Sequence, residues 1–214
     1  MTESDNLLFA TIDSIPLLDK EQAVKEILAL PDEYSFWDDY RYTKMFPLMT
    51  KNGTASREGS SNIQQGEFSW TEIAPKVIVD WCENHLFPWL GTKTRVMCLV
   101  TQPGVSNYEH IDCAKHELHS RQHKVRLVLQ GRTDTLYWLT DKGNVHVPNV
   151  DKVFVMDGGW PHGMTNTTDI PKVTLALGAP WTGRDSYDDL TILQSRSDYN
   201  MPEQIDHLWL KKIK

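Results

Sequence analysis

Two histidines and one aspartate are the residues of this sequence most able to do chemistry. His110 and Asp112 lie two positions apart in the segment YEHID, so on an extended strand both side chains leave the same face. His162 follows about fifty positions further on. Two imidazoles and one carboxylate on one side of a metal, with the other positions open, form the ligand set of non-haem Fe(II) oxygenases. An isolated His-x-Asp pair is common in a chain with eight histidines, so this hypothesis depends on the elements around the pair.

Length, composition and charge limit the class of protein. The chain has 214 residues, which can bury a sizeable core and usually form one domain with appendages. Hydrophobic residues at 40% and charged residues at 24% are ordinary for a soluble globular protein. The formal net charge of −7 argues against nucleic-acid binding, because affinity for the phosphate backbone rests on Lys and Arg.

The cysteines and the N-terminus favour a reducing compartment. Cys82, Cys98 and Cys113 form no C-x-x-C pair and no even framework. The first residues, MTESDNLLFA, lack the basic region and the apolar run of a signal peptide. No apolar window approaches the length of a membrane span. We therefore expect a cytoplasmic protein that has neither a membrane nor a nucleic acid as its partner.

Two segments before residue 90 have helical spacing. Leu17–Leu30 predicts a short amphipathic helix capped by Asp19, with Gln22 closing a capping box. Thr71–Leu86 predicts a second helix, with Pro75 in its first turn, where a missing N–H costs little. We expect both helices to pack against a sheet.

The rest of the N-terminal region is aromatic or rich in loop-forming residues. For the aromatic segment Tyr34–Phe46, a packed loop or edge strand is favoured over a wall of a substrate pocket. The composition of Lys51–Gln65 predicts a mobile loop, and such a loop could close over a site as a lid. We expect residues 1–90 to form a support of helices and loops.

From residue 94 the pattern changes to short β-rich runs separated by turns. The predicted strands are Arg95–Gln102, His123–Leu129, Thr135–Thr140, Val145–Val147, Lys152–Met156 and Lys172–Ala179. Strands at this spacing without helices between them favour antiparallel sheets folded as a sandwich or jelly roll. Such a fold brings distant strands to one barrel mouth. We expect a single domain with a jelly-roll core over 94–181 and a C-terminal extension over 182–214.

Two of these strands place cations on one face. Lys124 and Arg126 share a face of HKVRLVL, and Lys172 shares a face of KVTLALG with Thr174. Cations inside a barrel indicate an anion beside them. A lysine that begins a strand is more often a solvated edge charge, but its position ten residues after His162 favours the functional interpretation.

The segments QPGVSNYEHID, HKVRLVLQG and KVFVMDGGWPHGMTNTTDIPKVTLALG resemble the aspartyl/asparaginyl β-hydroxylase-like branch of the Fe(II)- and 2-oxoglutarate-dependent oxygenases. The resemblance covers roughly Arg95–Trp181. The positions that match the family pattern are His110, Asp112, His162, Asn166 and Lys172. The family commonly has Arg where Lys172 stands. The resemblance implies a mainly β fold with flanking helices, a double-stranded β-helix, which is a cupin-like jelly roll.

The resemblance also implies a reaction. Fe(II) would be held by His110, Asp112 and His162, and 2-oxoglutarate and O2 would be the cosubstrates. The implied activity is that of a dioxygenase that hydroxylates an unactivated C–H bond. Its substrate would be a free amino acid, or an Asp, Asn or similar residue in a peptide.

Five residues are implied as the binding site of 2-oxoglutarate. Lys172 is the candidate for the distal carboxylate, with Arg126 or Lys124 assisting, because charge-assisted hydrogen bonds would fix the orientation of the cosubstrate. Asn166 and Thr174 complete the set, the first by the family pattern and the second by its shared face with Lys172.

Three alternatives remain open. A cupin-like metalloenzyme could use the same ligands without 2-oxoglutarate. A non-catalytic jelly roll could contain His110 and His162 as ordinary hydrogen-bonded histidines. The histidine-rich segment after Asp112 could bind a metal with Cys113, although a solvated loop is favoured there.

Overall fold

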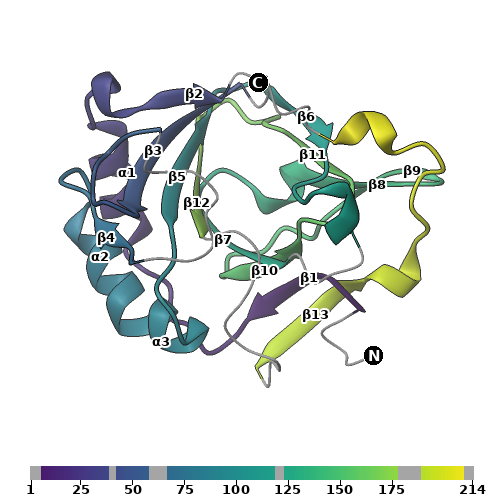
Figure 1. The fold of residues 1–214 in the computed structure, drawn as a ribbon, viewed down its shortest axis with the longest axis horizontal. Coiled ribbons are helices and arrows are strands. Elements are labelled where there is room, and N and C mark those ends of the chain that lie inside the picture. Colours follow the sequence, from purple (N-terminus) through teal and green to yellow (C-terminus); the bar gives the residue numbers. More distant parts are fainter. Residues whose placement is uncertain (1–5, 39–41, 58–66, 119–122, 178–188, 210–214) are drawn as a thin grey trace.

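Two antiparallel sheets form the body of the protein in a computed structural model that describes residues 6–38, 42–57, 67–118, 123–177 and 189–209 (Figure 1). Within these residues the larger sheet has nine strands, in the order β13 (Leu190–Ser195), β1 (Leu7–Ile12), β10 (Phe154–Asp157), β7 (His123–Gln130), β12 (Lys172–Leu177), β5 (Val96–Thr101), β3 (Thr43–Thr50) and β2 (Phe36–Asp38), with β4 (Ser69–Trp70) paired to β3. The smaller sheet has the order β6 (Ser106–His110), β11 (His162–Thr165), β8 (Leu136–Thr140) and β9 (Gly143–His146). This mainly β architecture confirms the predicted double-stranded β-helix.

Helices cover the outer face of the larger sheet. They are α1 (Lys20–Leu28), α2 (Lys76–Trp81), the π-helical turn η3 (Cys82–Leu86) and α3 (Phe87–Leu90). In Figure 1 they lie beside β3, β5 and β12. Ile27 of α1 and Ile78 of α2 belong to the same buried cluster as Leu127 of β7 and Leu175 of β12. This cluster is the main core, and it leaves the other face of the sheet for the site.

Five short 3-10 turns complete the described structure. They are η2 (Asp32–Tyr34), η4 (Lys115–Glu117), η5 (Thr133–Thr135), η6 (Arg196–Asp198) and η7 (Asp206–Leu208). No helix in the described part of the chain is long and apolar enough to cross a membrane.

The predicted alternation of β7 and β12 is present in the structure. Val125 and Leu127 on β7 and Val173 on β12 belong to the main core. Arg126 on β7 lines a cavity on the opposite face, as do other residues of the two strands, namely Val128, Lys172 and Thr174. The alternation therefore gives each strand one face that packs into the main core and one face that lines the cavity.

The two predicted helices differ from the structure in their details. The Asp19 carboxylate accepts a hydrogen bond from the Gln22 N–H at 3.0 Å, which confirms the predicted cap. The Gln22 side chain donates to Glu26 and does not close the predicted box. The second helix begins at Lys76, five residues later than predicted, because Pro75 takes the N-cap position with extended backbone.

The N-terminal ninety residues contribute strands as well as helices, which corrects the expectation of a helical and loop support. β1 (LLFATI) is buried along its whole length and pairs with both β10 and β13. A strand buried on both faces reads as a continuous apolar run without alternation, so its pattern is ambiguous. For the aromatic segment the sequence favours a packed loop or edge strand, and Phe36–Asp38 form the edge strand β2, whereas Thr43–Phe46 begin the interior strand β3.

Other predicted elements fall partly on residues that the structure does not describe. The strand predicted for Lys172–Ala179 is present through Leu177, and its last two residues lie outside the described ranges. Of the loop Lys51–Gln65, residues 58–65 also lie outside them. Its proposed closure as a lid therefore stays a prediction. The C-terminal region supplies β13 to the edge of the larger sheet.

Candidate metal centre

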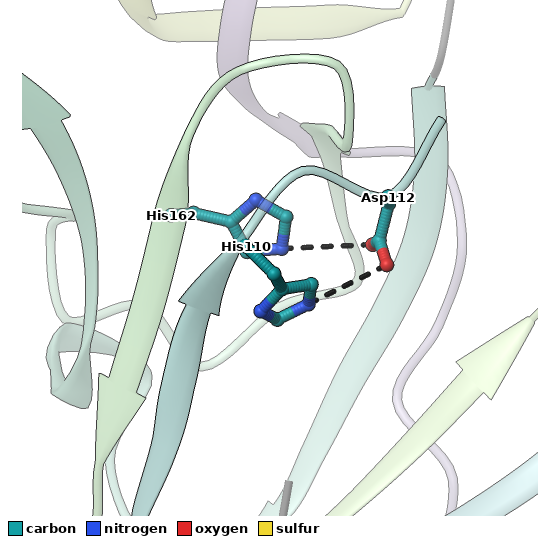
Figure 2. Close-up of side chains that lie close together, drawn as sticks. All are labelled: His110, Asp112 and His162. Carbon is teal, nitrogen blue, oxygen red and sulfur yellow. Dashed lines mark ion pairs between the residues drawn. The ribbon is translucent and has the colours of Figure 1, made fainter. Parts of the chain in front are cut away.

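His110, Asp112 and His162 converge at the smaller sheet (Figure 2). β6 and β11 pair with His110 directly opposite His162, which places the ring centroids 4.4 Å apart. Asp112 lies just beyond the end of β6 and not on the strand itself. Nε2 of His110 is 3.5 Å from Oδ1 of Asp112, and Nε2 of His162 is 3.5 Å from Oδ2. One candidate ligand atom from each residue lies within 4.8 Å of the others.

Backbone carbonyls fix the tautomer of both histidines. Nδ1 of His110 is 2.6 Å from the carbonyl oxygen of Tyr108, and Nδ1 of His162 is 2.8 Å from that of Trp160. A carbonyl oxygen can only accept, so each Nδ1 carries the proton and donates it. In the neutral imidazole each Nε2 then has a lone pair that faces the Asp112 carboxylate. This is how a histidine is oriented for metal binding.

The two Nε2 atoms and the Asp112 carboxylate are arranged as they would be around a bound cation. Two imidazole lone pairs and a carboxylate that face one another repel, and a cation between them would relieve this repulsion. Ligands at neighbouring positions of a metal with bonds of about 2.1 Å lie about 3 Å apart. The two His–Asp separations of 3.5 Å exceed that estimate by only about 0.5 Å, and all the candidate ligand atoms lie within 4.8 Å of one another.

Hydrogen bonds hold the two segments that carry these ligands. The N–H of Asp112 donates to the Gly158 carbonyl at 2.9 Å, which ties the Asp112 segment to the turn before His162. Asp157 is the last residue of β10, directly before that turn, and it pairs with Arg196 from the C-terminal region. Asp157 is buried, and burial raises the pKa of its carboxyl group, an effect that Arg196 opposes.

The C-terminal region also contacts the segment between the first two ligands. The N–H of Ile111 donates to the carbonyl of Leu208 at 3.0 Å, and Ile111 forms a parallel bridge with Trp209. Ile111, Cys113 and Leu208 form a small buried cluster. The region predicted as a C-terminal extension therefore contacts both ligand-bearing segments.

A cavity of roughly 680 Å³, including its open mouth, lies between the two sheets beside the three residues. Its lining comes from both sheets and includes His110, Asp112, His162, Arg126, Lys172, Thr174, Thr101 and Asn107. The apolar part of the lining is Leu99, Val128, Leu136, Phe154, Met156 and Met164. The structure thus brings the candidate ligands and most of the candidate cosubstrate residues to one cavity.

Lys172 is a buried cation of this cavity. Its side chain is enclosed, and Nζ donates to the hydroxyl of Thr135. The backbone of Gly131 passes over its stem so closely that a Cβ there would be 3.2 Å from Cγ of Lys172. Burial lowers the pKa of Lys172 to about 8, against a smaller opposing effect of Asp134. Among the described residues, no carboxylate lies within ion-pair distance of Lys172.

The other candidate cosubstrate residues differ in their surroundings. Arg126 lines the cavity while Nη1 donates to the carbonyls of Val125 and Leu177 at 3.0 and 3.4 Å. Lys124 instead contacts Asp112, with Nζ 2.7 Å from Oδ2. The sequence predicted neither this contact nor the hydrogen bond between Lys172 and Thr135, because both join residues that are far apart in the sequence.

Asn166 is fully buried in the loop between β11 and β12. Its Nδ2 donates to the carbonyls of Thr101 and Ile170 at 3.0 and 2.9 Å, and its Oδ1 accepts from Thr168. These bonds make Asn166 an organiser of the loop that leads to Lys172. A contact between Asn166 and a cosubstrate stays a prediction.

Comparisons with known proteins support the fold. No protein-family model matches the sequence, and no curated protein matches it. A prolyl hydroxylase from Trichoplax adhaerens, solved with a peptide fragment of the hypoxia inducible factor oxygen degradation domain, aligns with a TM-score of 0.53 at 13% identity over 84% of each chain. HygX from Streptomyces hygroscopicus, solved with nickel, 2-oxoglutarate and hygromycin B, aligns with a TM-score of 0.53 at 11% identity over 95% of this chain and 96% of that one. At these identities the likeness shows a shared double-stranded β-helix.

Proposed function

We propose that this protein is an Fe(II)- and 2-oxoglutarate-dependent dioxygenase that hydroxylates an unactivated C–H bond. The observation that carries the proposal is the convergence of two Nε2 lone pairs and one carboxylate in the cavity that also contains a buried lysine. The donor set matches the two-histidine, one-carboxylate triad of such enzymes. Two structural neighbours, the prolyl hydroxylase and HygX, give further support, because HygX was solved with nickel and 2-oxoglutarate.

His110, Asp112 and His162 would hold the metal on one side and leave the side towards the cavity open. Fe(II) bound there would supply the redox chemistry that couples reduction of O2 to decarboxylation of 2-oxoglutarate and to hydroxylation of the substrate. The protein's own part is to bind and orient. The carbonyls of Tyr108 and Trp160 hold the proton of each neutral imidazole on Nδ1, so that Nε2 would be the metal ligand.

Lys172 would bind the distal carboxylate of 2-oxoglutarate. A buried ammonium needs an anion, and a dianionic cosubstrate gives it one. Thr174 on the same face and Arg126 on the neighbouring strand would line the same part of the cavity. The apolar lining from Leu99, Phe154 and Met156 would exclude water from the reacting groups.

The substrate class is proposed from the sequence resemblance and the neighbours together. The resemblance to the aspartyl/asparaginyl β-hydroxylase-like branch favours a free amino acid, or an Asp, Asn or similar residue in a peptide. The Trichoplax enzyme was solved with a peptide, and HygX with hygromycin B, a small molecule. A peptide or a small molecule therefore remains the proposed partner. We also propose a cytoplasmic location, which fits three cysteines that are free and buried.

Turnover of the cosubstrate tests the proposal. Purified protein incubated with Fe(II), O2 and 2-oxoglutarate should form succinate, and an Asp112→Ala variant should not. A cupin-like enzyme that does not use 2-oxoglutarate would bind the metal and form no succinate. A non-catalytic jelly roll would do neither. Screening free amino acids and peptides for stimulated succinate formation would then identify the substrate class.

A further inference from the structure

A buried ion pair joins the larger sheet to the candidate metal centre. Lys124 lies on β7, and its Nζ is 2.7 Å from Oδ2 of Asp112. The two side chains are only 7% and 6% exposed. A desolvated, charge-assisted contact of this kind is strong, and breaking it leaves a buried charge without compensation. The carboxylate of Asp112 is therefore held in place from the opposite sheet.

The two oxygens of Asp112 have different surroundings. Oδ1 faces Nε2 of His110 at 3.5 Å. Oδ2 faces Nε2 of His162 at the same distance and also accepts the ammonium of Lys124. A carboxylate whose oxygens are both available can bind a metal through one oxygen or through both. The contact with Lys124 makes the two oxygens inequivalent.

We propose that Lys124 is a positioning residue that holds Oδ2 and so limits Asp112 to a single-oxygen bond with the metal. This inference rests on the proposed metal site. A single-oxygen bond leaves three positions open, which two-point binding of 2-oxoglutarate together with O2 requires. A carboxylate bound through both oxygens would occupy a further position and compete with the cosubstrate.

The position of Lys124 distinguishes this role from direct binding of the cosubstrate. Lys124 shares its face of β7 with Arg126 and Val128, and these two line the cavity. The described residues that line the cavity include Asp112 but not Lys124. Lys124 thus contacts Asp112 without being part of that lining, and it would act on the metal through Asp112.

Removal of the ammonium should have a selective effect. Lys124 and the metal share one carboxylate, so loss of Lys124 removes a competing cation and should not weaken metal binding. Binding of 2-oxoglutarate should weaken instead, because the ammonium no longer holds Oδ2 and this oxygen can take a position at the metal. A merely structural lysine would give the opposite result, since stability and metal affinity would fall together.

The test combines crystal structures and calorimetry of the Co(II)-loaded protein. In the wild type we expect one oxygen of Asp112 bonded to Co(II), with Nζ of Lys124 retained on the other. In Lys124→Met we expect both oxygens bonded, Co(II) affinity at least equal to that of the wild type, and a Kd for 2-oxoglutarate raised at least tenfold. Lys124→Arg, which keeps the charge, should restore the wild-type result.

Lys115→Met is a matched control, because Lys115 pairs with Asp206 at the surface, where the two side chains are 70% and 80% exposed. It should leave the affinities for Co(II) and for 2-oxoglutarate unchanged.

The proposal is overturned if wild-type Asp112 binds Co(II) through both oxygens, or if Lys124 no longer contacts Asp112 once Co(II) is bound. It is also overturned if Lys124→Met keeps the single-oxygen bond and the wild-type affinity for 2-oxoglutarate. Should Lys124→Met fail to fold, the loaded wild-type structure decides. Absence of Co(II) binding in the wild type would instead refute the metal site itself.

Discussion

His162 is the residue whose removal tests metal binding in the absence of any cosubstrate. His162→Ala deletes one of the two Nε2 donors, so a divalent metal should no longer stabilise the protein. In the wild type, a metal at about 100 times its Kd should add about 2.7 kcal/mol to the free energy of unfolding, and the variant should lose this gain. Thermal unfolding with and without Mn(II) measures it.

His116→Ala is the control for that measurement. His116 is exposed on η4, within the histidine-rich segment that could bind metal with Cys113. Among the described residues, His110, Asp112 and His162 form the one group whose donor atoms converge. If His116→Ala loses the stabilisation by metal and His162→Ala keeps it, the metal binds at the histidine-rich segment and not at the proposed site.

Lys172 carries the prediction for cosubstrate affinity. Lys172→Ala removes a charge-assisted contact worth on the order of 2–3 kcal/mol, or roughly a hundredfold in affinity, so the KM for 2-oxoglutarate should rise strongly. Metal binding should stay almost intact, because Lys172 contacts none of the three candidate ligands. Lys172→Arg should recover part of the loss. An unchanged KM in Lys172→Ala would contradict the assignment and make Arg126 the next candidate.

The pKa of Lys172 gives a pH dependence with a defined sign. Because burial lowers this pKa from its usual 10.5 to about 8, the empty site loses its proton as the pH rises through 8. Only the ammonium attracts the carboxylate, so the Kd for 2-oxoglutarate should rise about tenfold per pH unit above 8. Calorimetric titrations from pH 7 to 10 measure this. Lys172→Arg should remove the dependence, since Arg stays charged.

The same shift makes a separate prediction for stability. Between pH 8 and pH 10.5 the unfolded chain binds more protons at Lys172 than the folded protein does. The contribution of Lys172 to the free energy of unfolding should therefore increase with pH in this window. Urea unfolding of the wild type and of Lys172→Met, compared at pH 7.5 and pH 10, isolates that contribution. A difference between the two proteins that does not change with pH would contradict it.

At the scale of elements, the turn between β10 and β11 depends on the C-terminal region. Arg196 pairs with the buried Asp157 at the start of this turn, and the turn carries the backbone partners of Asp112 and His162. Arg196→Met should lower the free energy of unfolding by about 3 kcal/mol, because it leaves a buried carboxylate unpaired. Metal affinity should fall as well, since the turn positions two of the ligands.

Two further variants separate the ion pair from general damage. Adding Asp157→Asn to Arg196→Met removes the unpaired charge and should recover part of the stability. Lys115→Met breaks an exposed pair and should cost less than about 1 kcal/mol. Equal losses in Arg196→Met and Lys115→Met, measured by urea unfolding, would show that the buried pair has no special role.

The sequence predicted those elements whose pattern is local. Alternation in HKVRLVL and KVTLALG predicted two central strands together with the face that lines the cavity. β6 (SNYEH) and β11 (HGMT) were not predicted as strands of a sheet, because they are short and largely polar, and pairing with each other and with β8 defines them. β1 was missed because burial on both faces removes alternation.

The candidate site was predictable in its residue types and not in its contacts. The spacing of His110 and Asp112, with a later His162, is visible in the chain, and the structure brings these residues together. The pairing of Lys124 with Asp112 joins the two sheets across the sandwich. No spacing in the sequence encodes such a contact, because it depends on how the sheets pack.

At the scale of the whole molecule, the two sheets contribute different groups to the cavity. The smaller sheet and the segment after β6 supply the three candidate ligands, while β7 and β12 of the larger sheet supply the cations. The helices and the main core lie on the far face of the larger sheet, so substitutions in the cavity need not disturb them. Binding of a metal and of a dianion should therefore be coupled across the cavity.

Anaerobic calorimetric titration of 2-oxoglutarate tests the central claim most directly, with Fe(II)-loaded and metal-free protein compared side by side. The proposed site predicts one 2-oxoglutarate bound per chain when Fe(II) is present, and binding weaker by at least a hundredfold without it, because the metal supplies two of the contacts. His162→Ala should abolish the difference between the two forms. Binding that is equally tight with and without Fe(II), or no binding to the Fe(II)-loaded protein, would contradict the claim that this cavity holds the metal and the cosubstrate together.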